Sequence, residues 1–125
     1  MKQIIKTNKA PAPIGPYSQA VLSNGTLYIS GQIAINPASG ELVLDDIQSE
    51  TKQVMENIKA ILYDAGMDFS NVVKCSIFIS NMDNFGQINE VYGSFFINNY
   101  PARETVEVVR LPKDVNVEIS VIAGE

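Results

Sequence analysis

The sequence contains no histidine and no tryptophan, and Cys75 is its one cysteine. Without histidine, the protein cannot use a Ser-His or Cys-His nucleophile pair or an imidazole general base. One thiol without imidazole also falls short of the ligand set of most zinc, copper and haem sites. We therefore expect no metal and no cofactor. Catalysis would rely on carboxylates, arginine, lysine, tyrosine, hydroxyls, backbone groups and water.

Long apolar runs and nucleotide-binding motifs are missing as well. No window approaches the roughly 18 apolar residues of a membrane span, and the segment Met1–Lys6 lacks the apolar run of a signal peptide. No phosphate loop or dinucleotide fingerprint is present. One cysteine cannot form an internal disulfide. These absences predict a cytoplasmic protein that does not enter a membrane.

The charge balance is acidic, with nine Lys and Arg against fourteen Asp and Glu and a formal net charge of −5. This balance weighs against nucleic acid as a partner, because non-specific binding to phosphates needs a basic surface. A local basic patch remains compatible with it. The 125 residues are 46% hydrophobic, which predicts one domain spanning residues 1–125 with a real core.

The order of the expected elements is β-β-β-α-β-α-β-β. The expected strands span residues 2–6, 17–22, 26–30, 72–80, 103–110 and 115–122, and Asn24-Gly25 is a strong hairpin turn signal. A first helix begins after Asp45 or Asp46 and stops at Gly66. A second helix runs from Asp83 or Asn84 to Asn98, and its apolar residues recur at helical spacing.

The alternation in the fourth strand predicts one face with Val73, Cys75, Ile77 and Ile79. Two amphipathic helices can cover only one face of a sheet of about six strands. The other face must be solvated or meet another subunit. Self-association explains it with the fewest assumptions.

Arg103 and Glu118 are the two charged candidates for chemistry. Arg103 could hold a carboxylate with its two-pronged guanidinium, or it could be a surface residue paired with Glu104 or Glu107. Glu118 could orient a water as a general base, or it could lie on an ordinary solvated strand face. Its strand alternates between β-branched and polar residues, which places Glu118 opposite the helix-covered face.

The other candidates are less specific. Tyr17 leaves a rigid proline-rich loop and could serve a site or pack on the core. Asn89 could be a surface polar residue of its helix or a site amide. Gly31 could admit a ligand close to the backbone or simply end a strand. Cys75 is expected to be a buried, inert thiol.

Several segments together resemble the RidA/YjgF family of reactive-intermediate deaminases, nearly end to end and in the same order. The matching segments are Ala12–Gln19, Ser30–Ile33, Pro101–Arg103, Val106–Val108, Arg110–Asp114 and Val117–Ile119. The resemblance implies an α+β, chorismate-mutase-like fold with a six-stranded mixed sheet and two helices on one face. It also implies a homotrimer in which three sheets form a barrel-like core, with sites between subunits.

The implied activity is cofactor-free hydrolysis of 2-imino and enamine acids, such as 2-aminoacrylate and 2-aminocrotonate, to 2-oxo acids and ammonia. Carried over by motif, Arg103 binds the substrate carboxylate and Glu118 holds the attacking water. The cleft positions, which would bind substrate, are Tyr17, Ser30, Gly31, Asn89, Arg103 and Thr105.

The chain departs from many relatives after the arginine, where Glu104-Thr105 replaces their Ser-Cys. A thiol-based regulation is therefore not expected here, whereas a hydroxyl or backbone group can still bind a ligand. Alternative functions in this family are a regulator that binds a small 2-oxo acid, a ribonuclease that inhibits translation, and a holdase chaperone. A structural trimer with an inert cleft is a further alternative.

Overall fold

The computed structural model describes all residues, 1–125, and contains one six-stranded sheet. The strands are β1 (Lys2–Ile5), β2 (Ala20–Ser23), β3 (Thr26–Gln32), β4 (Val72–Ile79), β5 (Ala102–Glu107) and β6 (Val117–Gly124). Their order is β1-β2-β3-β6-β4-β5, and only the β4–β5 pair is parallel. The expected mixed sheet and order of elements are confirmed.

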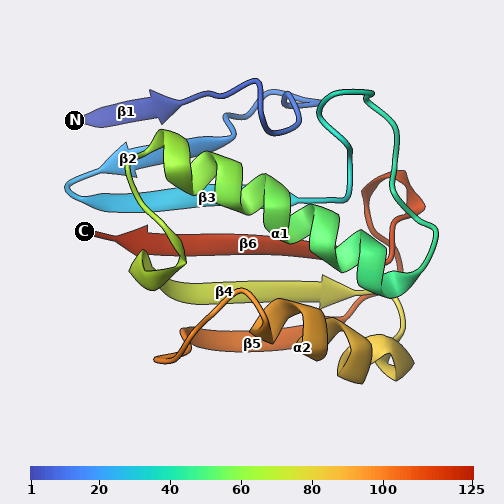
Figure 1. Cartoon of the computed structure of the whole chain (residues 1–125). Coiled ribbons are helices and arrows are strands. Elements are labelled where there is room, and N and C mark those ends of the chain that lie inside the picture. Colours follow the sequence, from blue (N-terminus) through green and yellow to red (C-terminus); the bar gives the residue numbers. More distant parts are fainter.

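Both helices, α1 (Ile47–Asp64) and α2 (Phe85–Gly93), lie on the same side of the sheet (Figure 1). We call this side the helix-covered face and the other side the open face. The main core fills the space between the helices and the sheet, and it contains buried residues of β3, β4, β6 and both helices. No helix in the structure has the length and apolar character that crossing a membrane requires.

The first helix begins and ends where the sequence predicts. Asp46 is the N-cap, and its carboxylate accepts a hydrogen bond from the Ser49 amide at 2.7 Å. Gly66 follows the helix with φ 76°, a conformation that glycine adopts without steric cost. The Asn24-Gly25 turn is also confirmed, because both residues have positive φ, as a type I′ hairpin turn requires.

The expected face of β4 is wrong at Val73. A register shift between Val72 and Lys74 in the β4–β6 pairing turns Val73 outward and places Val72 in the core. Val73 is 55% exposed. Beyond this bulge the alternation holds, and Cys75 lies buried on the helix-covered face.

The second helix is shorter than its apolar pattern predicts, because it ends at Gly93 and not at Asn98. The Ser94 hydroxyl donates to the Val91 carbonyl at 2.6 Å, and tight turns follow in which the amides of Phe95 and Phe96 donate three residues back. These turns bring Phe95 and Phe96 against Phe69, with ring centroids 5.4 Å apart in both pairs. Aromatic packing therefore replaces the last helical turn.

The last two strands are also displaced from their expected limits. β5 ends at Glu107 and not at Arg110, and β6 starts at Val117 and not at Val115. Between them lies a short turn in which Lys113 and Asp114 have φ of 55° and 57°. Left-handed backbone at two consecutive residues cannot continue a strand.

Candidate active site

Glu118 lies on the open face, as its strand pattern predicts. In the register of the central strands it stands beside Phe78 of β4, which in turn stands beside Val106 of β5. The carboxylate is half-buried and accepts no hydrogen bond in the chain. Desolvation raises the pKa of Glu118 above the ordinary range of a glutamate. A carboxylate with a raised pKa and free oxygens is a candidate general base.

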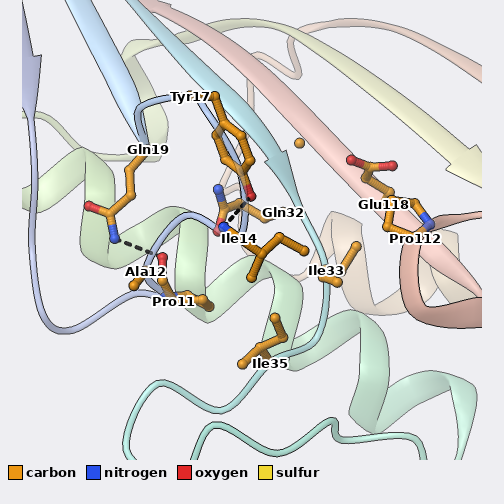
Figure 2. Close-up of a pocket in the computed structure, with 11 residues that line it drawn as sticks. Pro11, Ala12, Ile14, Tyr17, Gln19, Gln32, Ile33, Ile35, Pro112 and Glu118 are labelled. Carbon is orange, nitrogen blue, oxygen red and sulfur yellow. Dashed lines mark hydrogen bonds between the residues drawn. The ribbon is translucent and has the colours of Figure 1, made fainter.

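A small cavity opens beside this carboxylate, and we call it the Glu118 pocket (Figure 2). Its lining residues are Pro11, Ala12, Ile14, Tyr17, Gln19, Gly31, Gln32, Ile33, Ile35, Pro112 and Glu118. Figure 2 shows the Glu118 side chain entering from the side opposite Tyr17. The cavity of about 50 Å³ has room for water.

Gly31 lies directly beside the Glu118 carboxylate. A Cβ atom built on Gly31 would overlap the Oε2 atom and crowd the Cδ atom of Glu118. The space of a side chain at position 31 is thus already taken by the carboxylate. Gly31 lies where β3 shifts register against β6, between Ile29 and Gln32. The sequence alternative that this glycine only ends a strand is wrong.

The proline-rich loop forms the opposite wall of the Glu118 pocket and is held by Gln19. The Gln19 amide donates to the carbonyls of Thr7, Ala10 and Pro11 and accepts from the Thr7 amide at 2.8 Å. The Tyr17 hydroxyl accepts from the Ile14 amide at 3.2 Å (Figure 2). Tyr17 is 46% exposed, so its ring faces the pocket and solvent and does not belong to the core.

Ser30 stands next to Gly31 and fixes the same wall. Its hydroxyl donates to the Ser18 carbonyl at 2.6 Å. The Ser30 amide also donates to the Gln19 carbonyl at 2.9 Å. Ser30 therefore ties the loop exit to β3, and its hydroxyl retains a lone pair for a ligand.

Arg103 lies on the helix-covered face, because it stands beside the buried Cys75 in the β4–β5 register. Its guanidinium carbon is 5.1 Å from the ring centroid of Tyr92 and 5.6 Å from that of Phe85. One guanidinium nitrogen donates to the Asn89 side-chain carbonyl at 2.6 Å. Phe85, Asn89 and Tyr92 share one face of α2, so this helix holds the arginine by cation–π contacts and a hydrogen bond.

Arg103 has no carboxylate partner, which contradicts the alternative of a surface ion pair. Glu104 points to the open face and contacts Lys74 at 3.0 Å and the Ser76 hydroxyl. Glu107 accepts from the Met82 amide at 2.7 Å. The guanidinium therefore keeps donors free for an anion. It lines a cavity with Asn89, Tyr92, Gly93, Tyr100 and Pro101, which we call the Arg103 pocket.

Thr105 follows Arg103 on the same face of β5. Its hydroxyl is buried and has no hydrogen-bond partner in the chain. Buried polar atoms are rarely left unsatisfied, so this hydroxyl has spare capacity for a ligand. Cys75 is buried, and burial raises the pKa of its thiol, which makes it inert as expected.

The predicted site residues form two groups that one chain does not bring together. Tyr17, Gly31 and Glu118 line the Glu118 pocket, and Ser30, next to Gly31, binds the Ser18 carbonyl beside it. Asn89, Arg103 and Thr105 lie on the helix-covered face. The sheet separates the two groups, and no group of three or more His, Cys, Asp or Glu residues is placed to hold a metal ion.

The sequence argument missed several residues that shape these pockets. The apolar pattern of the second helix does not distinguish Tyr92 and Phe85 from core residues, although these two rings hold Arg103. Glu50 was not considered, although it is fully buried. The available signal for Glu50 was its position three residues after Ile47 and four before Val54, on the apolar face of α1.

Comparisons with known proteins cover nearly the whole chain. The family model described as Endoribonuclease L-PSP matches residues 7–125. A protein of Bos taurus named 2-iminobutanoate/2-iminopropanoate deaminase is 49% identical over 98% of this chain and 90% of its own length.

Two solved structures extend the similarity to three dimensions. A Yersinia pestis protein of the conserved Rid family, YyfA, has 52% identity and a TM-score of 0.97, and both chains are covered completely. Escherichia coli TdcF, solved with bound serine, has 42% identity and a TM-score of 0.95, with 98% of both chains covered. The chain therefore belongs to the RidA/YjgF family.

Proposed function

We propose that this protein hydrolyses small 2-imino acids and their enamine tautomers to 2-oxo acids and ammonia. The observation that carries the proposal is the free arginine: Arg103 is oriented by α2 and has no carboxylate partner. Glu118 supplies a desolvated carboxylate beside a cavity with room for water. A 2-imino acid needs one group for its carboxylate and one for its attacking water, and these two residues meet both needs.

The site is composite in this proposal. Arg103 and Glu118 lie on opposite faces of the same sheet, so the arginine of one subunit would meet the glutamate of its neighbour. The open face carries Ile4, Tyr28 and Val106, each more than 40% exposed, and such apolar exposure favours a subunit interface. We propose the trimer that the family resemblance implies. The cytoplasmic location stays a prediction of the sequence.

The reaction follows from these positions. Arg103 and the Thr105 hydroxyl hold the substrate carboxylate, and the enamine tautomerises to the imine. Glu118 takes a proton from water as the oxygen attacks the imine carbon. Glu118 passes this proton to the nitrogen, which gives the carbinolamine. Glu118 then moves the carbinolamine hydroxyl proton to the nitrogen in the same way, the C–N bond breaks, and the 2-oxo acid and ammonia leave, so one water is consumed and one ammonia is released. The imine is already electrophilic, so positioning and one base can suffice.

The direct test uses threonine dehydratase to generate 2-iminobutanoate in the assay. The protein is expected to accelerate 2-oxobutanoate and ammonia release above the spontaneous rate. Saturable binding of 2-oxobutanoate without turnover would favour the regulator alternative. Cleavage of RNA without imine turnover would instead support the activity in the family model's description, which the net charge of −5 disfavours.

A mixing experiment tests the composite site. Arg103→Ala and Glu118→Gln subunits are each expected to be inactive alone. In trimers formed from equal amounts of both, about a quarter of the sites would receive both native residues, and about that fraction of activity should return. As a control, Arg103→Ala mixed with the double variant should regain nothing. Mixed trimers that stay inactive would argue that both residues act within one chain.

Gly31→Ala is expected to lower kcat by about 100-fold, because the new methyl group displaces the Glu118 carboxylate. The matched control is Gly86→Ala, since Gly86 lies in α2 with open space around it and an ordinary helical backbone. Ammonia release under the same coupled conditions measures both variants. Native activity in Gly31→Ala would show that the observed carboxylate position is not the reactive one.

A further inference from the structure

Glu50, in the first turn of α1, is a fully buried carboxylate with no cation beside it. Its Oε2 atom accepts hydrogen bonds from the amides of Asn116 at 2.7 Å and Val117 at 3.2 Å. Its Oε1 atom accepts from the Asn116 side-chain amide at 2.7 Å. A buried charge requires such compensation. All three bonds reach residues that directly precede Glu118.

Asn116 connects this carboxylate to a third element. Its carbonyl accepts from the Ser80 amide at 3.1 Å, and its side-chain oxygen accepts from the Ser80 hydroxyl at 3.4 Å. Ser80 follows β4 directly. The first turn of α1, the end of β4 and the start of β6 are thus tied at one point, at the right-hand end of the sheet in Figure 1.

Packing and pairing also support the start of β6, because Val115 and Val117 are buried and Val117 pairs with Ile79 of β4. The residues before it include Lys113 and Asp114, whose left-handed backbone must be held by surrounding contacts. Pairing with β4 begins only at Val117, and on the other side β3 is out of regular register beside Gly31. The bonds that Glu50 makes to Asn116 and Val117 add to this pairing and hold the backbone just before Glu118.

We propose that Glu50 is a positioning residue for Glu118: it fixes the start of β6 so that the Glu118 carboxylate sits over Gly31. This inference rests on the proposed function, because it treats Glu118 as the base. Glu50 itself does not reach the Glu118 pocket. We call the hydrogen bonds from Asn116 and Val117 to Glu50 the tie. Loss of the tie should lower kcat and leave KM, which Arg103 governs, nearly unchanged.

The hydrogen bond between Asn116 and Glu50 can be tested by swapping the amide and the carboxylate between the two positions. Asn116→Asp sets two carboxylates against each other, because Asn116 Nδ2 is the group that donates to Glu50 Oε1. Glu50→Gln restores a donor, so the double variant regains one hydrogen bond between the two side chains. The amide oxygen that this change leaves at position 50 can still accept from the two backbone amides. Each single change and the double change then form a cycle that isolates this contact.

We expect Asn116→Asp to lower kcat by about 10- to 100-fold with KM within about threefold of the native value. Adding Glu50→Gln should return kcat to within about threefold of the native protein. Glu56→Gln is the matched control, because Glu56 lies on the same helix but lines a separate surface hollow with Thr7 and Lys59. A folded Asn116→Asp with native kcat, or one that Glu50→Gln does not rescue, would overturn the proposal.

If Asn116→Asp does not fold, a milder variant tests the same hydrogen bonds. Glu50→Asp withdraws the carboxylate by one methylene while keeping its charge, and kcat should fall by about tenfold or more. Native kcat in a folded Glu50→Asp contradicts the tie. If the native protein shows no imine turnover, the proposed function fails, and exchange of the Val117 amide hydrogen still tests the tie. That exchange should be faster in Glu50→Asp, and an unchanged rate overturns the inference.

Discussion

Arg103→Ala is expected to abolish measurable hydrolysis of 2-iminobutanoate while the fold stays intact. Two charge-assisted hydrogen bonds to the substrate carboxylate contribute about 1.5–3 kcal/mol each. Their loss corresponds to a fall in kcat/KM of about 10²–10⁴-fold. The rate in the coupled ammonia assay would then approach that of the spontaneous reaction.

Stability should fall only modestly, because Arg103→Ala removes one hydrogen bond to Asn89 and two cation–π contacts but no ion pair. Arg103→Lys separates charge from geometry. A lysine keeps the positive charge but lacks the planar two-pronged donor, so we expect a partial loss of activity. Native activity in Arg103→Ala, with an unchanged oligomeric state, would remove Arg103 from the site.

Glu118→Gln is expected to lower kcat by about 10²–10⁴-fold, which is the usual contribution of a general base. The amide cannot take the proton of the attacking water, although it fills the same space over Gly31. Substrate binding should persist, because Arg103 lies on the other face of its own sheet. Single-turnover measurements with 2-iminobutanoate would separate the two effects.

The pH profile carries a second signature of Glu118. Desolvation raises its pKa, so the acidic limb of kcat/KM should lie above the ordinary value of about 4.3 for a glutamate. That limb should vanish in Glu118→Gln. No histidine limb can appear near neutral pH, because the chain contains no histidine. A limb that persists in Glu118→Gln would assign the titration to the substrate or another group.

The same shift has a consequence for stability, with a defined sign. The native state binds the Glu118 proton more tightly than the unfolded chain does. This group therefore favours folding below its unfolded-state pKa, and that contribution is lost as the pH rises through the folded-state pKa. At neutral pH, Glu118→Gln should melt no lower than the native protein. A clearly lower melting temperature would show that the charge has a partner in the assembled protein.

Local signals predicted the secondary structure well where they did not compete with tertiary contacts. The Asp46 cap, the Gly66 stop and the Asn24-Gly25 turn act over a few residues, and all three are confirmed. Val73 and the end of α2 were predicted wrongly for a common reason. A bulge against β6 and aromatic packing on Phe69 involve distant residues, and periodicity along the chain does not contain them.

In the candidate site, too, local signals were predicted correctly and contacts between distant residues were not. Residue types and motifs pointed to Arg103 and Glu118, and the surface-pair alternative for Arg103 fails because Glu104 and Glu107 have other partners. The strand alternation placed Arg103 and Glu118 in their strands. It predicted the face of Glu118 but not that Arg103 lies on the opposite face, because the relation between the two strands depends on the pairing of β6 with β4 and of β4 with β5.

The sequence alone determined which chemistry is available: without histidine, an arginine, a glutamate and a water must act on a substrate that is already reactive. It also determined the order of strands and helices, because hydrophobic periodicity and caps are local. Only the tertiary structure decided that Glu118 lies over Gly31 and that Glu50 holds Asn116, 66 residues away. Those contacts join segments distant in the chain, and packing and hydrogen bonding in the folded protein select them.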